Sequence, residues 1–230
     1  MIVRTAILFT LALAACGDGL APPALDAGVD ALTDATSPDA APAPWPFALP
    51  AGFPSPRLPP DARLTVELAE LGRYLFYDVN LSGNRTQACA SCHRQAQAFS
   101  DGLTTPTGST GDRLRRNAMS LTNAAYNPAQ TWANPQATTL ERQALIPILG
   151  KHPVELGVAG REEEILTRFV TDAAYPTRFA AAFPDEPAPI TWPNIVRALA
   201  AFERRLISGG SRVDRFRAGA LDLLYIAPER

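Results

Sequence analysis

Hydrophobic residues recur at helical spacing in two segments of the chain. The first stripe comprises Leu64, Leu68, Leu71 and Leu75. The second stripe comprises Ile195, Leu199, Phe202 and Leu206. We expect the first helix to start near Asp61, which can act as its N-cap. The second helix should start at Thr191, with Pro193 just inside it, and end at the glycine pair Gly209-Gly210.

Other segments carry shorter helix signals or loop signals. Residues 139–149 predict a helix that extends to about Pro147, and the acidic run at residues 162–164 suits a first helical turn. Residues 100–115 are rich in Gly, Ser and Thr and predict a loop. No segment alternates apolar and polar residues as a half-buried strand would, and we find no internal repeat. The expected fold class is therefore all-α, with long loops.

The first residues are typical of an export signal. Arg4 precedes an apolar run at residues 6–15, which is too short to span a bilayer, so residues 1–15 predict a secretory signal peptide. The sequence LAAC at residues 13–16 resembles a bacterial lipobox, which predicts cleavage before Cys16 and its lipidation. An ordinary signal peptide that happens to contain a cysteine is the alternative. Lipidation would place the protein on the periplasmic or cell-surface side of a membrane.

The rest of the chain divides by composition. Residues 16–60 are rich in Ala, Pro and Asp and predict a tether, whose last part, residues 45–60, should lie extended on the domain surface. We expect a folded domain at residues 61–216 and a divergent tail at residues 217–230. Lys and Arg number 21 against 23 Asp and Glu, so no basic excess indicates nucleic-acid binding.

The motif CASCH carries the strongest chemical signal. Cys89 and Cys92 are spaced to add across the two vinyl groups of a haem, and His93 would be the axial iron ligand. The motif predicts one covalent haem c in a cytochrome c-like haem domain. A zinc half-site and a thioredoxin-type redox pair are the alternatives. The zinc site lacks an evident fourth ligand, because His152 is the only other histidine, and no βαβ pattern supports the redox pair.

The sixth iron position decides what such a haem does. Electron carriers usually fill it with Met or His, whereas enzymes leave it open to substrate. The strong ligands available are Met119, His152 and Met1, if Met1 survives processing. Because the chain offers few such ligands, the sequence favours an open sixth position on the iron.

Ordered motifs over residues 50–216 carry a resemblance to a known family. They are LGRYLFYD (71–78), CASCH (89–93), AFSD (98–101), RNAMSLTN (116–123), TW (131–132), TLERQ (139–143), HPVELG (152–157) and AFER (201–204). On these motifs the chain resembles the bacterial di-haem cytochrome c peroxidase superfamily, which includes MauG. The stretches TWANP and HPVELG are most similar to the MbnH-like di-haem enzymes associated with copper-protein operons.

The resemblance implies a role for each matching position. His93 would be the proximal ligand of the peroxide-reacting haem, and Glu155 the acid that moves a proton between the two peroxide oxygens. Gln143 would lie near that acid, and Trp132 would relay electrons between two haems. Asn117 would be a calcium ligand. Without the family, these side chains are a surface Glu, a core Trp and a loop Asn.

Two features depart from the usual pattern of the family. Residues 100–116 contain no histidine, so the haem should be open without reductive activation. His152 stands where relatives have another polar residue; it either caps the loop that presents Glu155 or reaches the iron. The family also has a second half with its own CxxCH, whereas this sequence has one such motif, which indicates a truncated or frameshifted product or a fragment.

Three functions follow from these features. The first is a peroxidase that reduces hydrogen peroxide and oxidises a donor cytochrome or a substrate protein, which the MbnH-like branch suggests is a copper-binding partner. The second is a monohaem electron-transfer or haem-binding protein without catalysis. The third is an inactive remnant. A short helix around residues 221–225 could replace the missing half.

Overall fold

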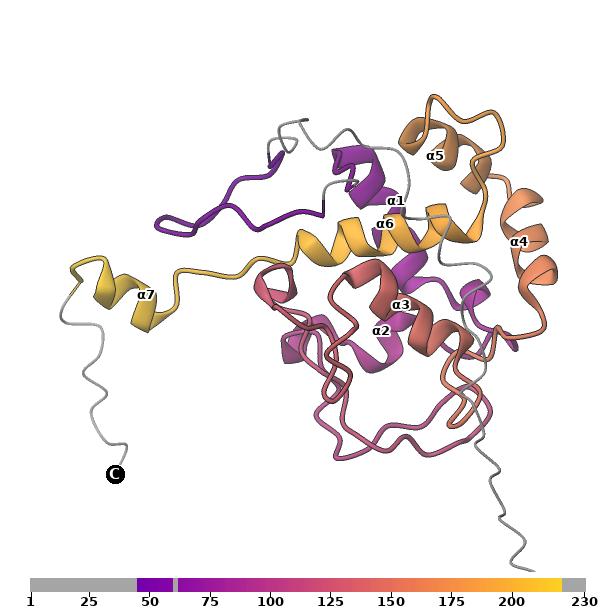
Figure 1. The fold of residues 1–230 in the computed structure, drawn as a ribbon, viewed down its shortest axis with the longest axis horizontal. Helices are drawn as coiled ribbons and strands as arrows, with labels where there is room; N and C mark the ends of the chain where they lie inside the picture. The colour runs from indigo at the N-terminus through magenta and orange to yellow at the C-terminus, as the bar shows by residue number, and fades with distance from the viewer. Residues whose placement is uncertain (1–44, 60–61, 221–230) are drawn as a thin grey trace, which may run out of the picture. The chain divides into compact units, whose positions relative to one another are not determined.

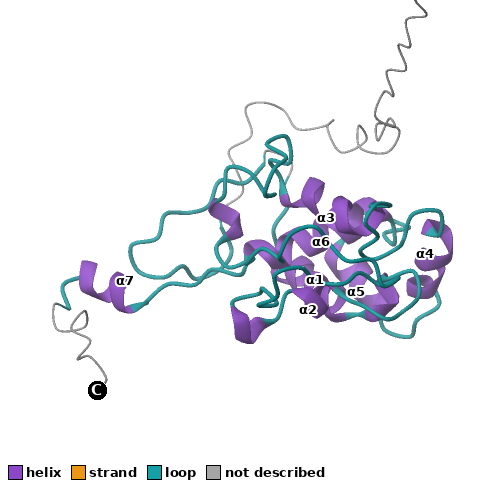
Figure 2. Ribbon diagram, turned by 90° about the horizontal axis from the view of Figure 1, so that it is seen from below, coloured by secondary structure: helices purple, strands orange, loops and turns teal. Residues whose placement is uncertain are grey.

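The computed structural model describes residues 45–59 and 62–220. The α-helices are α1 (Val66–Tyr77), α2 (Cys89–Cys92), α3 (Leu140–Leu149), α4 (Glu162–Val170), α5 (Tyr175–Ala182), α6 (Trp192–Arg204) and α7 (Arg212–Arg217). Three 3₁₀ turns add η2 (Val79–Leu81), η3 (Gln95–Gln97) and η4 (Ala124–Tyr126). Within the described ranges only isolated β-bridges occur, which confirms the all-α class with long loops (Figure 2).

Several predictions fall outside the described residues: the signal peptide, Cys16 with most of the tether, the Asp61 cap and the helix at residues 221–225. Among the residues that are described, no helix is long and apolar enough to cross a membrane.

Helices α1 and α6 form the centre of the hydrophobic core, and they make the most extensive contact between any two helices described (Figure 1). The two predicted leucine-rich stripes face each other there, with Leu68, Leu75 and Leu199 almost fully buried. Gly72 allows this approach, because a Cβ at that position would lie 1.8 Å from the carbonyl oxygen of Ala198. Both stripes are therefore confirmed as core-facing.

The ends of these two helices differ from the prediction. Helix α1 begins at Val66, where the Thr65 hydroxyl accepts a hydrogen bond from the Leu68 amide at 3.1 Å and acts as the N-cap. Helix α6 begins as predicted after Thr191 but ends at Arg204, before Gly209-Gly210. The amide of Leu206 bonds to the Glu203 carbonyl in a tighter turn, so the helix stops although the apolar spacing continues.

Among the other helices, α3 runs past its expected end, and α5 and α7 form where no helix was predicted. Helix α3 starts at Leu140, one residue after the expected Thr139, which caps it. It continues past the expected end near Pro147 to Leu149, where the Gly150 amide bonds to the Ile146 carbonyl. Helix α5 was not predicted. The Asp172 carboxylate accepts hydrogen bonds from the amides of Ala174 and Tyr175 just before it, which is a start signal readable in the sequence.

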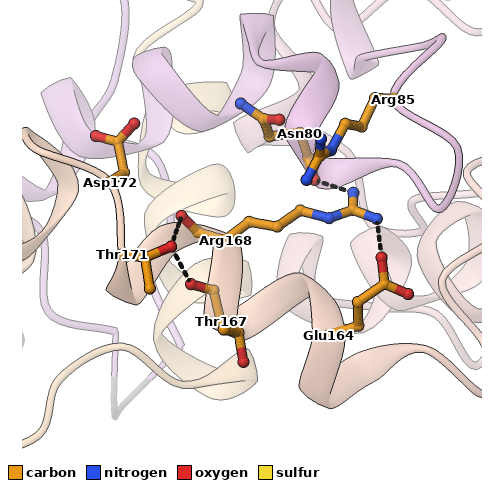
Figure 3. A pocket seen from close by; sticks show the side chains of 7 residues that line it. All are labelled: Asn80, Arg85, Glu164, Thr167, Arg168, Thr171 and Asp172. Atoms are coloured by element: carbon orange, nitrogen blue, oxygen red, sulfur yellow. Dashed lines mark hydrogen bonds and ion pairs between the residues drawn. The ribbon is translucent and has the colours of Figure 1, made fainter.

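Two surface segments support the haem-motif region. Residues 45–59 lie against the core as predicted, and the Tyr126 hydroxyl donates to the Pro54 carbonyl at 2.8 Å. On α4 the Arg168 guanidinium donates to the carbonyls of Asn80, Ser82 and Gly83 at 2.7 to 2.9 Å. Figure 3 shows the bond to Asn80. Arg168 pairs with Glu164 as well. These bonds fix the turn that leads from α1 into the CASCH motif.

Candidate functional site

The CASCH motif forms one short helical turn. Helix α2 spans Cys89–Cys92, and its first turn is closed by the Ala88 amide, which donates to the Ser91 hydroxyl at 3.0 Å. The amide of His93 donates to the Cys89 carbonyl at 3.0 Å. Residues three positions apart share a helix face, so the two half-buried thiols lie on the same side with His93 directly after them.

A backbone carbonyl sets the tautomer of His93. The ring Nδ1 lies 2.9 Å from the Phe99 carbonyl oxygen, and because a carbonyl only accepts, Nδ1 carries the proton. The Nε2 lone pair is then available to a metal. Burial lowers the pKa of His93, which keeps the imidazole neutral near pH 7.

Unusual backbone geometry presents that carbonyl. Ala98 and Phe99 both adopt positive φ angles, 54° and 58°. The Phe99 amide bonds to the Arg94 carbonyl, and the Arg94 amide bonds to the Ser100 carbonyl, each at 2.9 Å. These bonds hold a strained turn, which orients the Phe99 carbonyl oxygen toward the His93 ring.

A cavity of about 540 Å³ opens next to the motif, and a pocket of about 50 Å³ adjoins it. Because the two share lining residues, we refer to them as the wide and narrow parts of one cavity. The larger volume falls within the range typical of cofactor sites. Cys92, His93, Gln143 and Glu155 line both parts. The wide part therefore brings the proposed iron ligand together with all three predicted catalytic residues, because Trp132 lines it as well, and the narrow part holds His93 with Gln143 and Glu155.

Backbone hydrogen bonds on both sides fix the loop that carries Glu155. The Val154 amide donates to the Asp112 carboxylate at 2.9 Å, and the Leu156 amide donates to the Pro147 carbonyl at 2.9 Å. The Glu155 carbonyl itself accepts from the Ser109 amide at 2.7 Å. Burial raises the pKa of the half-buried Glu155 carboxyl, which favours a group that can both give and take a proton.

Two glycines allow this loop to be held so closely. A Cβ on Gly108 would lie 1.8 Å from the Val154 carbonyl oxygen, and one on Gly83 would lie 2.2 Å from the Gly157 carbonyl oxygen. Any side chain at either position would displace the loop that bears Glu155. These glycines and Asp112 were missed by the sequence reasoning, because the contacts join segments far apart in the chain.

Trp132 and Asn117 lie together at the wider part of the cavity. The Trp132 indole Nε1 donates to the Asn117 backbone carbonyl at 3.1 Å. Trp132 is 52% exposed, and Asn117 is exposed as well. Their side chains therefore border both the cavity and solvent.

The two candidate sixth ligands are placed differently. Met119 lines the wider part of the cavity together with His93. His152 is exposed and is not among the residues that line either part. Met119 therefore remains a candidate for the sixth iron ligand, whereas His152 would have to move to reach an iron.

Glu203 is a further acid at the site that sequence reasoning missed. It comes from α6, lines the narrow pocket together with Cys89, and is 5% exposed. Its Oε2 atom has no hydrogen-bond partner among the described residues, and burial raises the pKa of the carboxyl to about 8. The neighbouring Arg204 is committed to Glu141, with one of its two hydrogen bonds at 2.8 Å. The sequence signal that could have pointed to Glu203 is an acidic residue directly after Phe202, a member of the predicted apolar stripe.

The donor set fits a covalently bound haem. It offers two thiols on one helical turn, a neutral imidazole with a free Nε2, and a largely apolar cavity beside them. Burial raises the pKa of Cys92, and burial followed by the charge of Glu203 raises that of Cys89 to about 12. These shifts favour the thiol over the thiolate, which disfavours thiol–disulfide exchange. No group of three metal-ligating His, Cys, Asp or Glu residues occurs in the described part of the chain.

Comparisons with known proteins agree with this geometry. MauG, the methylamine utilization protein of Methylophilus methylotrophus, is 36% identical over 173 residues, covering 75% of this chain and 49% of MauG. Cytochrome c551 peroxidase of Nitrosomonas europaea is 32% identical over 154 residues, covering 66% of this chain and 44% of the peroxidase. The crystal structure of a MauG-like protein associated with microbial copper homeostasis matches with 45% identity and a TM-score of 0.74.

That structural match covers 76% of this chain and 51% of the MauG-like protein, so the chain spans about half the length of the relatives it matches. The family described as di-haem cytochrome c peroxidase matches residues 66–222, which include the CASCH motif, both walls of the cavity and helix α6. The family binds c-type haem, in agreement with the donor set. This chain belongs to the di-haem cytochrome c peroxidase family.

Proposed function

We propose that this chain forms a c-type haem site that reduces hydrogen peroxide and takes the electrons from a protein or cytochrome partner. The observation that supports this most is the shared cavity of His93 and Glu155, one a neutral ligand and the other a buried acid. When bound, the haem supplies an iron that accepts peroxide and exchanges electrons with it.

The residues of the CASCH motif would hold the group. Cys89 and Cys92 would each form a thioether with a vinyl substituent, and His93 would ligate the iron through Nε2. The hydrogen bond from Nδ1 to the Phe99 carbonyl fixes the ring and makes the imidazole a stronger donor. One haem per chain follows from the single CxxCH motif.

Glu155 and Gln143 would handle peroxide on the cavity side. As a carboxylate, Glu155 takes the proton from the oxygen that binds; as an acid, it returns that proton to the oxygen that leaves as water. Its raised pKa reduces the difference in energy between the two forms near neutral pH. The Gln143 amide lines the same cavity and can orient peroxide by hydrogen bonding.

Trp132 and Asn117 would act at the outer part of the cavity. Trp132 has an oxidisable ring that borders both the cavity and solvent, so it can pass electrons inward from a donor. Asn117 is the proposed calcium ligand. Its backbone carbonyl already accepts from Trp132, which would couple the ion to the position of the ring.

We further propose that the protein is exported and anchored through lipidated Cys16, as the N-terminal sequence predicts. The electron donor is a cytochrome or a substrate protein. The likeness to a MauG-like protein associated with microbial copper homeostasis supports a copper-binding partner.

One observation favours a second function. Met119 lines the cavity that holds His93, and a Met ligand opposite His is typical of electron carriers. If Met119 filled the sixth position, the chain would carry electrons without reacting with peroxide. The spin state of the ferric haem separates the two functions.

The test of the peroxidase function is stopped-flow absorption of the haem-loaded protein mixed with hydrogen peroxide. Rapid change of the haem spectrum supports the proposal, and an unchanged spectrum contradicts it. Peroxide takes two electrons, so without a donor the protein must supply them. We expect bleaching of the haem or oxidation of Trp132, Tyr126 or Met119, which peptide mass analysis would detect. Sustained turnover without such damage would contradict this second expectation.

A further inference from the structure

A row of aromatic rings joins His93 to the surface on α1. The ring centroid of the fully buried Phe76 lies 6.4 Å from that of His93 and 5.3 Å from that of Tyr77. Phe202 reinforces the contact, with its centroid 5.0 Å from Phe76 and 6.4 Å from Tyr77. One buried ring therefore separates the proposed iron ligand from Tyr77.

Tyr77 is the member of this row that can be oxidised and reached from outside. Tyr77 is 46% exposed, whereas Phe76 is 0% and Phe202 is 6% exposed. Electron tunnelling weakens steeply with distance, and closely packed rings provide a short path. Phenylalanine is much harder to oxidise than tyrosine. If this row of rings loses an electron, the radical therefore forms on the phenol of Tyr77.

We propose that Tyr77 is a surface redox site, which gives an electron to the oxidised haem pocket through Phe76 and His93 and regains one from a reductant in solution. This inference rests on the peroxidase function proposed above. It assigns a second electron route that enters on the His93 side, separate from the route through Trp132 at the wide part of the cavity.

The chemistry balances with hydrogen peroxide as the oxidant. One peroxide, two electrons and two protons give two waters. With a reductant present, Tyr77 supplies the two electrons one after the other: each time its O–H bond breaks, the proton passes to water at the exposed hydroxyl, and a neutral phenoxyl radical remains. A soluble phenol restores Tyr77 by giving up one hydrogen atom. Without a reductant, two such radicals from two chains join through a new C–C bond, and the hydrogen of each joined ring carbon moves to the oxygen of the same ring, which restores both phenols as dityrosine.

Two other tyrosines, Tyr74 and Tyr175, are less suited to this role. Tyr74 lies one turn earlier on α1, but the guanidinium groups of Arg178 and Arg73 lie over its ring at 3.9 and 4.6 Å, and nearby positive charge disfavours removal of an electron. Tyr175 is buried, and its hydroxyl donates to Asp78 at 2.7 Å. Tyr74 is thus a matched control for Tyr77, on the same helix and 40% exposed.

The experiment treats the haem-loaded full chain with hydrogen peroxide and a nitroso spin trap, and peptide mass analysis then locates the trapped radical. We expect an adduct on Tyr77 that Tyr77→Phe abolishes and Tyr74→Phe preserves, while both variants keep the wild-type rate of the first haem spectral change. Without the trap, dityrosine fluorescence and a covalent dimer should appear in wild type and in Tyr74→Phe and be absent from Tyr77→Phe.

The outcomes separate the two proposals. A haem that reacts with peroxide while Tyr77 stays unlabelled, or is labelled no more than Tyr74, overturns the Tyr77 assignment alone. A haem spectrum that peroxide leaves unchanged overturns the peroxidase function, and the Tyr77 assignment with it. A Trp132→Phe variant adds a second check, because closing one route should raise the labelling of Tyr77.

Discussion

The narrow and wide parts of the cavity differ in how firmly the chain holds them. At the narrow part, His93 is tied to the Phe99 carbonyl, the Glu155 loop is bonded through Val154 and Leu156, and Glu203 is buried on α6. At the wide part, Trp132 and Asn117 are exposed and share one indole-to-carbonyl hydrogen bond. The segments that carry the groups proposed to react with peroxide are held by hydrogen bonds and burial, whereas the groups proposed to receive electrons from a donor are exposed to solvent.

The difference indicates which part of the chemistry this chain can organise alone. Every side chain proposed to hold haem or move a proton is positioned by residues within the described domain. The electron-receiving edge borders solvent, and the matched part of this chain covers about half the length of the relatives. Changes at the narrow part should therefore affect haem attachment, peroxide reaction and stability, and changes at the wide part should affect the destination of the electrons.

The largest effect should come from removing the two thiols. We expect Cys89→Ser combined with Cys92→Ser to abolish covalent haem, since no other thioether donors lie in the motif. Intact mass after denaturation should exceed the processed polypeptide by one haem in wild type and by none in the variant. A wild type without haem mass, produced in cells competent in cytochrome c maturation, would contradict the assignment of the motif.

The next effect should come from Glu155→Gln, which keeps the shape of the side chain and removes its acid–base function. We expect the peroxide reaction to slow by about a hundredfold or more, with haem attachment unchanged. Stopped-flow absorption measures the rate, and Glu163→Gln, at an exposed position on α4, is the matched control. A variant as fast as wild type would show that Glu155 has only a structural role.

Glu203→Gln should change how stability depends on pH. The folded-state pKa of Glu203 is about 8, above its ordinary value of 4.5, so the folded chain holds this proton more tightly than the unfolded chain. Its contribution is complete below pH 4.5 and is lost as the pH rises to about 8, at ~1.4 kcal/mol per pH unit at most.

Urea unfolding at pH 5 and pH 8 measures this contribution. The free energy of unfolding should fall more in wild type than in Glu203→Gln over that interval. His93 acts in the opposite direction, because its lowered pKa favours the folded state as the pH rises. Both proteins contain His93, so its effect cancels when the two are compared. Equal losses in both proteins would show that Glu203 titrates normally.

The smallest change in stability should come from Trp132→Phe. The side chain is exposed and contributes one hydrogen bond, so we expect a loss of about 1 kcal/mol or less. The peroxide reaction should begin at the wild-type rate, while the pattern of oxidised residues shifts away from position 132. A large drop in the initial rate would place Trp132 in the proton-handling part of the site.

The sequence predicted the elements whose signals are local. The stripes on α1 and α6, the caps Thr139 and Thr191, and the acidic first turn of α4 all mark helices that form where expected. Helix ends were less predictable: α1 begins at Val66 rather than near Asp61, and α6 ends five residues before Gly209. Local hydrogen bonds decide these ends, and the apolar spacing does not report them.

The site could be predicted only as far as its motifs reach. CASCH and HPVELG indicated His93 and Glu155, but not how the chain holds them. The Phe99 carbonyl, Asp112 and the two glycines Gly83 and Gly108 act through contacts that exist only after folding. Glu203 was hidden because its helix position continues an apolar stripe, where an acid is normally absent.

The most direct test of the central claim is the spin state of the ferric haem, measured by absorption and electron paramagnetic resonance before any peroxide is added. An open site with His93 as its single protein ligand predicts a high-spin haem that reacts at once with peroxide, and Met119→Leu should leave the spectrum unchanged. A low-spin, six-coordinate haem that becomes high-spin in Met119→Leu would contradict the claim and identify the chain as an electron carrier.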